Sequence, residues 1–433
     1  AAAAAPSPPA SSNPETSARV AKLRGLLSQM IADEQRRLRE RPDRPSGAPE
    51  PLPGETVSTP QGPLHRVRVY LEPAHHHGRV PIASALGACP RVLAKLALDP
   101  GLETVDPRRL LYIDTETTGL AGGTGTLPFL IGLAWFEDES LCVEQLLLRA
   151  PGEETPMLAQ LAERIAMASG VVSYNGKAYD WPLLRNRFVL NRVPVAVPAA
   201  HLDLLHCARR VFKRRLGQVR LVNMEEQVLD MRRERDVDGA EIPDLYWEYV
   251  RGGDGSTLAP VIEHNANDLI ALAAILATLA DRYVRIGPED EPEDRLGVAS
   301  VAARADDKDR ASRYAAAAAE GGGPDDVTAD ALWLGAELAR QRDDHEARRE
   351  LLWRGLETAT GDALRAARFA LALSKHYEHR VRDFERALEL ARATVAYEGM
   401  ADSEHRAARI EAKIARAAAK LARPGRRRRA RDD

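Results

Sequence analysis

Acidic side chains at the end of one apolar run are the first residues whose type and spacing could do chemistry. Asp114 and Glu116 follow the apolar residues 110–113 and stand two positions apart. Because side chains alternate across a strand, both carboxylates would project from the same strand face. Such oxygen ligands suit Mg²⁺, and paired ions can clamp the attacking and leaving oxygens of a phosphodiester. An isolated Asp-x-Glu is equally typical of a solvated strand end.

Two further acidic positions occur later, in contexts that could bring them beside this strand. Asp180 follows an apolar run and precedes Trp181-Pro182, where a helix would open, although an Asp here is also an ordinary helix cap. Asp268 stands four positions after His264 on a long helical pattern, so the two side chains share a helix face. The imidazole could accept a proton from metal-polarised water; the alternative is a surface pair.

Taken in order, these segments resemble the three motifs of the four-carboxylate (DEDD) 3′→5′ exonuclease superfamily. Residues 63–285 look like its YprB-type ribonuclease H-like branch. The resemblance implies a ribonuclease H-like fold, two Mg²⁺ or Mn²⁺ ions and release of nucleoside monophosphates from a 3′ end. Carried over by position, it makes the catalytic carboxylates and metal ligands Asp114, Glu116, Asp180 and Asp268, with His264 as the proton acceptor.

The spacing of the histidine departs from the superfamily pattern. Members with a histidine base usually place it five residues before the last aspartate, where this sequence has Glu263. His264 instead has the four-residue spacing of members with a tyrosine base, so the identity of the base stays open. The segment around Asp203 also fits the branch. Asp203 would either orient a ligand or His264, or cap a helix.

The elements that must position these residues predict an α/β fold, a ribonuclease H-like mixed sheet flanked by helices. Apolar runs separated by turns predict strands, and amphipathic or long apolar stretches predict helices. The expected strands are 110–120, 128–138, 141–150, 171–174 and 199–203, and the expected helices are 153–168, one from 180, one through 215 and 258–283.

Changes in composition predict five regions. These are a mostly disordered tail with one helix (18–39) at 1–62, an extension packed on the nuclease domain at 63–107, the nuclease domain at 108–285, an α-helical domain at 286–422 and a basic tail at 423–433. In the helical domain, segments around Asp344 and Asp383 look alike at an offset of 39. This resembles tetratricopeptide helix pairs that bind a protein partner, while a generic helical bundle remains open.

Basic and aromatic residues near the motifs are candidates for binding nucleic acid. Tyr179 and Trp181 flank Asp180 and could stack a terminal base, or either could fill the core. A basic helix supplies candidate phosphate contacts, unless its charges are only a solvated face. These contacts are Arg209, Arg210, Lys213, Arg214 and Arg215, with Arg220 beyond them. The sequence does not distinguish DNA from RNA.

Composition argues against several other classes of protein. No apolar run approaches the ~20 residues that would span a bilayer. Three cysteines lie far apart in the 433 residues, which disfavours a disulfide framework and a zinc site and favours a reducing cytoplasm. The glycines at 119–125 lack a Lys-Ser/Thr ending, so a phosphate cradle is not expected. His75, His76 and His77 are interpreted as a loop rather than a metal site.

The carboxylate pattern and the family resemblance together predict a cytoplasmic, metal-dependent 3′→5′ exonuclease acting on single-stranded or frayed nucleic acid, and the polarity is implied by the resemblance alone. The alternative from another class is a non-catalytic scaffold, in which a degenerate nuclease fold binds nucleic acid and the helical repeats bind a partner. A third interpretation is an endonuclease, which requires a groove open at both ends. The presence of all four carboxylates favours an enzyme, since a scaffold does not need them.

Overall fold

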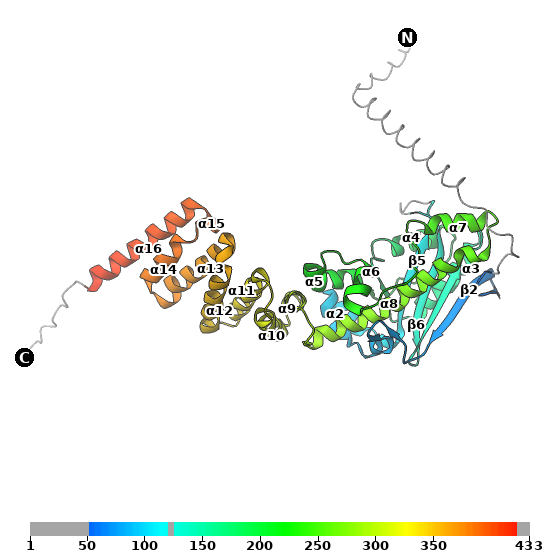
Figure 1. Cartoon of the computed structure of the whole chain (residues 1–433), viewed down its shortest axis with the longest axis horizontal. Helices are drawn as coiled ribbons and strands as arrows, with labels where there is room; N and C mark the ends of the chain where they lie inside the picture. Colours follow the sequence, from blue (N-terminus) through cyan, green and yellow to red (C-terminus); the bar gives the residue numbers. More distant parts are fainter. Residues whose placement is uncertain (1–51, 120–124, 422–433) are drawn as a thin grey trace, which may run out of the picture. The chain divides into compact units, whose positions relative to one another are not determined.

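The structure is a computed structural model that describes residues 52–119 and 125–421 (Figure 1). The expected helix at 18–39, the basic tail at 423–433 and most of the glycine-rich turn lie outside these residues. Within the described part of the chain, no helix is both long enough and apolar enough to cross a membrane.

A seven-stranded mixed sheet forms the centre of the first domain. In spatial order its strands are β1 (Glu55–Thr59), β2 (Gly62–Leu71), β7 (Ser140–Leu147), β6 (Pro128–Glu137), β5 (Leu110–Thr117), β8 (Gly170–Ser173) and β9 (His201–Asp203). Pairing is antiparallel from β1 through β5, whereas β5, β8 and β9 run parallel. The carboxyl ends of the three parallel strands therefore share one edge, where α/β sheets commonly bind ligands. A separate small sheet contains β3 (His76–His77) and β4 (Val80–Pro81).

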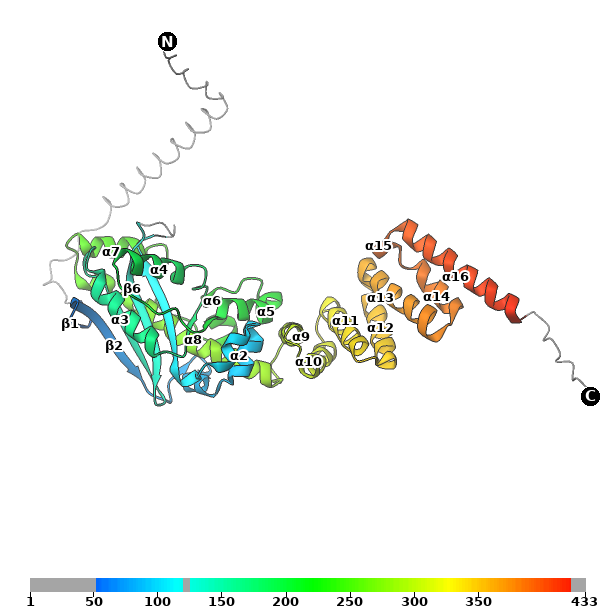
Figure 2. The ribbon, with the colours of Figure 1, turned by 180° about the vertical axis from the view of Figure 1, so that it is seen from behind.

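Helices cover both faces of this sheet (Figures 1 and 2). They are α2 (Pro90–Ala97), α3 (Glu154–Met167), α4 (Asp180–Leu190), α5 (Leu204–Leu216), α6 (Leu221–Met224), α7 (Ile242–Val250) and α8 (Ala259–Val284), with short turns η1 (Ile82–Gly87), η2 (Pro100–Thr104), η3 (Pro107–Arg109), η4 (Glu225–Leu229) and η5 (Gly255–Leu258). On one face, α2, α5 and most of α8 pack on Tyr112. On the other, α3, α4 and α7 pack on Leu111 and Ile113. Successive residues of β5 thus enter opposite cores, as strand alternation requires.

The predicted fold class is confirmed, with one difference at the N-terminal side. The hairpin of β1 and β2 crosses the expected boundary between 62 and 63, because β2 pairs with β7 along the edge of the main sheet. The short strand β1 is mostly exposed and has no apolar run, which is why the sequence pattern did not reveal it. Residues 55–71 are therefore part of the sheet.

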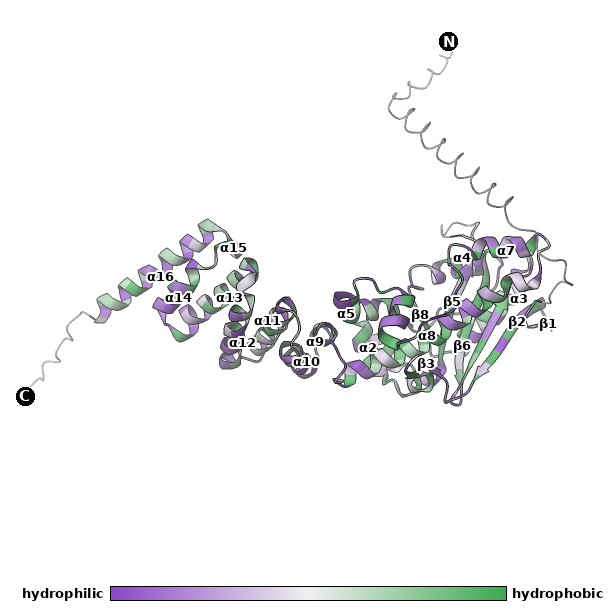
Figure 3. Ribbon diagram, viewed as in Figure 1, coloured by the Kyte–Doolittle hydropathy of each residue, from purple (hydrophilic) through white to green (hydrophobic). Residues whose placement is uncertain are grey.

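The remaining described chain is helical. Its elements are α9 (Pro292–Arg304), α10 (Lys308–Glu320), α11 (Asp325–Gln341), α12 (His345–Thr358), η6 (Ala359–Gly361), α13 (Ala363–His376), η7 (Tyr377–Val381), α14 (Phe384–Arg392), α15 (Val395–Glu398) and α16 (Met400–Leu421). These helices mix hydrophilic and hydrophobic residues, whereas the strands and α8 are richer in hydrophobic ones (Figure 3). This region confirms the predicted helical domain after the sheet.

The two segments that look alike at an offset of 39 form the same turn. Asp343 and Arg382 have positive φ, and each is followed by an aspartate whose side chain caps the next helix. Asp344 accepts a hydrogen bond from the amide of Ala347, and Asp383 accepts one from Arg386. The repeated sequence is therefore a repeated helix–turn–helix junction, while the tetratricopeptide resemblance stays a prediction.

Candidate active site

Strand β5 carries the first two carboxylates of the site. It lies between β6 and β8, with Asp114 opposite Gly132 and Glu116 opposite Leu130 in the register with β6. The first half of the strand is buried and apolar, and the second half, from Asp114, is only partly buried. A register shift after Glu116 ends the regular pairing. The strand therefore delivers both side chains to one face, close to the carboxyl edge of the sheet.

A buried amide holds Asp114. Asn265 of α8 is fully buried and donates from Nδ2 to Asp114 Oδ2 at 2.8 Å. Its own Oδ1 accepts a hydrogen bond of 2.9 Å from Gln145 of β7. Gly132 makes the room, because a Cβ atom there would lie 2.2 Å from Asn265 Oδ1. Sequence reasoning missed all three residues, since buried polar partners follow no apolar period.

The turn after β8 places Asp180 at the start of α4. Asp203 accepts hydrogen bonds from the amides of Asn175 (2.8 Å) and Lys177 (3.1 Å). It also caps α5 through the amide of Leu205. Asp203 therefore caps a helix, as one interpretation expected, and also positions a neighbouring segment. That segment is the turn before Asp180 and not His264. The hydroxyl of Thr115 on β5 donates to Asp180. Repulsion from Asp180 raises the pKa values of both Asp114 and Glu116, so the third carboxylate lies near the first two.

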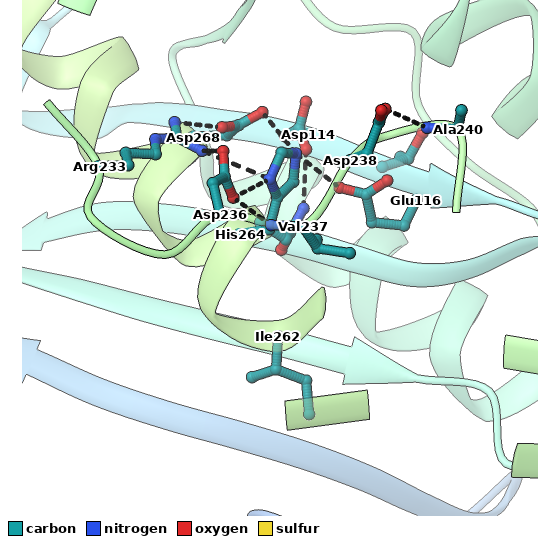
Figure 4. A network of polar contacts seen from close by, with 12 residues as sticks. Asp114, Glu116, Arg233, Asp236, Val237, Asp238, Ala240, Ile262, His264 and Asp268 are labelled. Atoms are coloured by element: carbon teal, nitrogen blue, oxygen red, sulfur yellow. Dashed lines mark hydrogen bonds and ion pairs between the residues drawn. The ribbon is translucent and has the colours of Figure 1, made fainter. Parts of the chain in front are cut away.

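Helix α8 brings Asp268 and His264 to the same place (Figure 4). His264 Nε2 lies 3.8 Å from Glu116 Oε1 and 3.8 Å from Asp268 Oδ2. Its Nδ1 lies 2.6 Å from Asp236 Oδ1. Glu263, at the spacing expected for a histidine base, is exposed. In this arrangement the imidazole, and not Glu263, faces the carboxylates.

The four carboxylates perturb one another electrostatically. Burial, followed by repulsion from Asp268, Glu116 and Asp180, raises the pKa of Asp114 well above its usual value. Burial also raises the pKa of Glu116, to about 7, against the attraction of His264. The pKa values of Asp180 and Asp268 are raised as well, again mainly by burial. The ionised form of these carboxylates is therefore disfavoured in the absence of a cation, as expected for residues that bind a metal ion.

The donor set fits a hard divalent ion, because it consists of carboxylate oxygens from three separate elements. Within residues 52–119 and 125–421, no three His, Cys, Asp or Glu side chains already converge as the ligands of one ion. The fit accordingly rests on donor chemistry and mutual repulsion, rather than on a completed coordination shell. The residues that could hold metal are Asp114, Glu116, Asp180 and Asp268.

Arg233 is a cation at the rim of the site that the sequence analysis did not single out. It forms ion pairs with Asp268, with Glu225 at 2.9 Å and with Asp236 at 3.1 Å. Burial alone would lower the pKa of Arg233, but Asp268 and Glu225 raise it overall. Glu225 also contacts His77 Nε2 at 2.8 Å. His77 was expected in a loop, but it is a buried strand residue that supports this charge network.

The predicted nucleic-acid contacts divide into two groups. Arg214 pairs with Asp326 and Asp330 of α11, and Arg215 pairs with Asp294 of α9, so both hold the helical domain. Arg210 donates to the carbonyl of Leu96.

The second group stays exposed. Arg209, Lys213 and Arg220 line a cavity of about 600 Å³ together with Tyr174 and Asn175, the residues that begin the Asp180 turn. Among the described residues, no acidic side chain pairs with these three cations. Tyr179 is 65% exposed. Trp181 packs against the core beneath α4, which leaves Tyr179 as the accessible aromatic residue.

Comparison with known proteins gives the same assignment for the fold. Residues 111–280, which include all four carboxylates, match the family described as RNase_H superfamily. The uncharacterized protein YprB of Bacillus subtilis (strain 168) is 29% identical over 311 residues, covering 71% of this chain and 74% of that protein. The resemblance to the YprB-type ribonuclease H-like proteins is thereby confirmed. Similarity to this superfamily supports nuclease-type activity on nucleic acid.

Proposed function

We propose that this ribonuclease H-like protein is a metal-dependent 3′→5′ exonuclease that hydrolyses single-stranded or frayed nucleic acid. The observation that supports the proposal most strongly is the partly buried, mutually repelling set Asp114, Glu116, Asp180 and Asp268 beside His264. A structural role would not require four carboxylates that repel one another. The electrostatic free energy lost by placing them together therefore indicates a functional role.

In this proposal, the four carboxylates hold two Mg²⁺ or Mn²⁺ ions. When bound, such ions lower the pKa of water and stabilise the charge on the departing 3′ oxygen. The protein's own residues hold the ligands still. Asn265 fixes Asp114, Thr115 fixes Asp180, and Arg233 fixes Asp268. Because these partners come from different elements, the site is organised by the fold.

His264 is the proposed proton acceptor. Its Nε2 faces Glu116 and Asp268, where a water between them would be within reach. Although burial lowers the pKa of His264, Asp268, Asp236 and Glu116 raise it overall. The imidazolium that forms when Nε2 accepts a proton is therefore stabilised by its surroundings.

The substrate strand is proposed to pass over the exposed cations Arg209, Lys213 and Arg220, with Tyr179 available to stack a base. The helical domain is the proposed site for a protein partner. Cys89, Cys142 and Cys207 are free thiols, which suits the proposed location in the reducing cytoplasm.

The direct test is degradation of 3′- and 5′-labelled single-stranded DNA and RNA, as linear and circular forms, with Mg²⁺ or Mn²⁺. We expect linear strands to shorten from the 3′ end and circles to survive, and Asp114→Ala/Glu116→Ala to be inactive. Cleavage of circles would identify an endonuclease instead. If wild type and double mutant both bind every substrate without degrading it, the protein is a scaffold.

A further inference from the structure

Asp236 makes the shortest polar contact of His264. Its Oδ1 lies 2.6 Å from Nδ1 of the ring, and its Oδ2 accepts from Arg233 at 3.1 Å (Figure 4). Asp236 lies in the connecting segment (residues 230–241), which has no regular secondary structure and joins η4 to α7. A residue far from α8 in sequence therefore meets the side of the ring that points away from the carboxylates.

This contact determines which ring nitrogen can accept a proton. Two groups approach Nδ1, Asp236 Oδ1 at 2.6 Å and Arg233 Nη1 at 3.5 Å. A carboxylate only accepts hydrogen bonds, so the shorter contact requires the hydrogen on Nδ1, and in the neutral ring the lone pair is then on Nε2. Nε2 is the nitrogen 3.8 Å from both Glu116 and Asp268. The opposite tautomer would direct an N–H toward the carboxylates and would leave no acceptor there.

The connecting segment is itself anchored. Arg233 holds Asp236 from one side, approaches His264 Nδ1 at 3.5 Å, and also contacts Asp268 and Glu225. Glu225 is buried and contacts His77 of β3. The position of Asp236 is thus tied to the metal-ligand carboxylate and to the N-terminal part of the sheet domain, and not only to the ring.

We infer that Asp236 is a positioning residue that holds His264 with Nε2 toward the reacting centre. This contact would allow a histidine four residues before Asp268 to serve as the proton acceptor. The inference rests on the proposed nuclease function. His264 remains the group that accepts the proton, and Asp236 acts through it.

The test compares Asp236→Asn with Asp238→Asn, a matched change two positions along the same segment. Asp238 accepts from the amide of Ala240 and makes no contact with His264. We expect Asp236→Asn to lower kcat by about 10- to 100-fold with KM nearly unchanged, because a general base contributes ~10²–10⁴ and part of it remains. Asp238→Asn should keep the wild-type kcat, and the melting temperatures of both variants should stay close to that of wild type.

A double-mutant cycle with His264 distinguishes a positioning role of Asp236 from a general effect on the structure. We expect Asp236→Asn/His264→Gln to be no slower than His264→Gln, because Asp236 acts only through the ring. If the two losses multiply, or if Asp236→Asn turns over at the wild-type rate, the inference is wrong.

A measurement without turnover keeps the inference separate from the proposed function. In protein labelled with ¹⁵N-histidine, at a pH of about 9, the His264 signals identified by their loss in His264→Gln should show hydrogen on Nδ1. They should change in Asp236→Asn but not in Asp238→Asn. A ring protonated on Nε2 in wild type would overturn the inference even if the enzyme is active, and an inactive protein with hydrogen on Nδ1 would refute only the proposed nuclease activity.

Discussion

Two acidic sites in the sheet domain are built on opposite principles. Glu144 of β7 is fully buried, lies directly opposite Arg68 in the β2 register, and contacts Arg66, Arg68 and Arg164. Arg164 also stacks over Trp135, which fixes its head group. The cluster around Asp114 is only partly exposed, and the pKa of Asp114 is raised by burial and then by the neighbouring carboxylates Asp268, Glu116 and Asp180.

The difference shows how to recognise function in a buried charge. Surrounding a carboxylate with cations offsets much of its desolvation cost and makes it part of the architecture. Where several carboxylates lie together, the desolvation free energy is not offset unless a bound cation supplies positive charge. Among the described residues, Arg233 pairs with Asp268 but not with Asp114, Glu116 or Asp180, so much of the negative charge of the site is not neutralised by arginine.

The largest effect is expected on catalysis. Asp114→Asn keeps an oxygen that can accept from Asn265 but removes one negative charge. Loss of a ligand worth several kcal/mol in the transition state should lower the degradation rate by roughly 10³-fold or more. The stability of the metal-free protein at pH 7 should hold or rise. Both quantities follow from timed degradation and urea unfolding, and a clear fall in stability would make Asp114 an architectural residue.

Glu144→Gln should give the converse result. The change leaves three arginines around a neutral side chain. Because these arginines are partly exposed, the free energy of unfolding should fall by about 3 kcal/mol, the lower end of the range for removing one partner of a buried ion pair. Activity per folded molecule should stay at the wild-type value. Urea unfolding with a parallel activity assay measures both, and lost activity at full stability would contradict the comparison.

Added metal should act at the Asp114 cluster, and its effect should depend on pH. These carboxylates have raised pKa values, about 7 for Glu116, against about 4 in the unfolded chain, so the folded state binds more protons between those values. Stability of the metal-free protein from these groups should therefore fall as pH rises from about 4 to about 7.

Added Mg²⁺ should accordingly raise the melting temperature more at pH 8 than at pH 5. This difference should disappear in Asp114→Asn/Glu116→Gln, which serves as the control, while Glu144→Gln should retain it. Thermal melting with and without Mg²⁺ is the measurement. An equal response of wild type and the double variant would place the ions elsewhere.

The smallest effect concerns cations rather than anions. Arg209 and Lys213 are exposed without acidic partners among the described residues, whereas Arg214 on the same helix is paired with Asp326 and Asp330. Arg209→Gln/Lys213→Gln should reduce the slope of log affinity against log salt by about 0.7 per lost phosphate contact on a single strand. Arg214→Gln should leave that slope unchanged and lower the melting temperature. Salt titrations of fluorescent oligonucleotide binding distinguish these outcomes.

Sequence patterns predicted the elements with regular spacing. The alternation on β5 placed Asp114 and Glu116 together, and the helical spacing of His264 and Asp268 put both on one face of α8. The partners of these residues could not be predicted in the same way. Asp236 lies 28 positions from His264, and Asn265 lies 151 positions from Asp114. Such contacts depend on how irregular segments and distant strands come together, which no local period records.

Gly132 has a consequence for how this protein can diverge. The glycine lies opposite Asp114, and any larger residue would displace the amide of Asn265 that holds it. Positions 132 and 265 should therefore change together among descendants, or not at all, while selection maintains the reaction. A lineage in which residue 132 has gained a side chain should soon lose its acidic residues as well. The identity of residue 132 should therefore show whether a relative can still hold its first carboxylate in place.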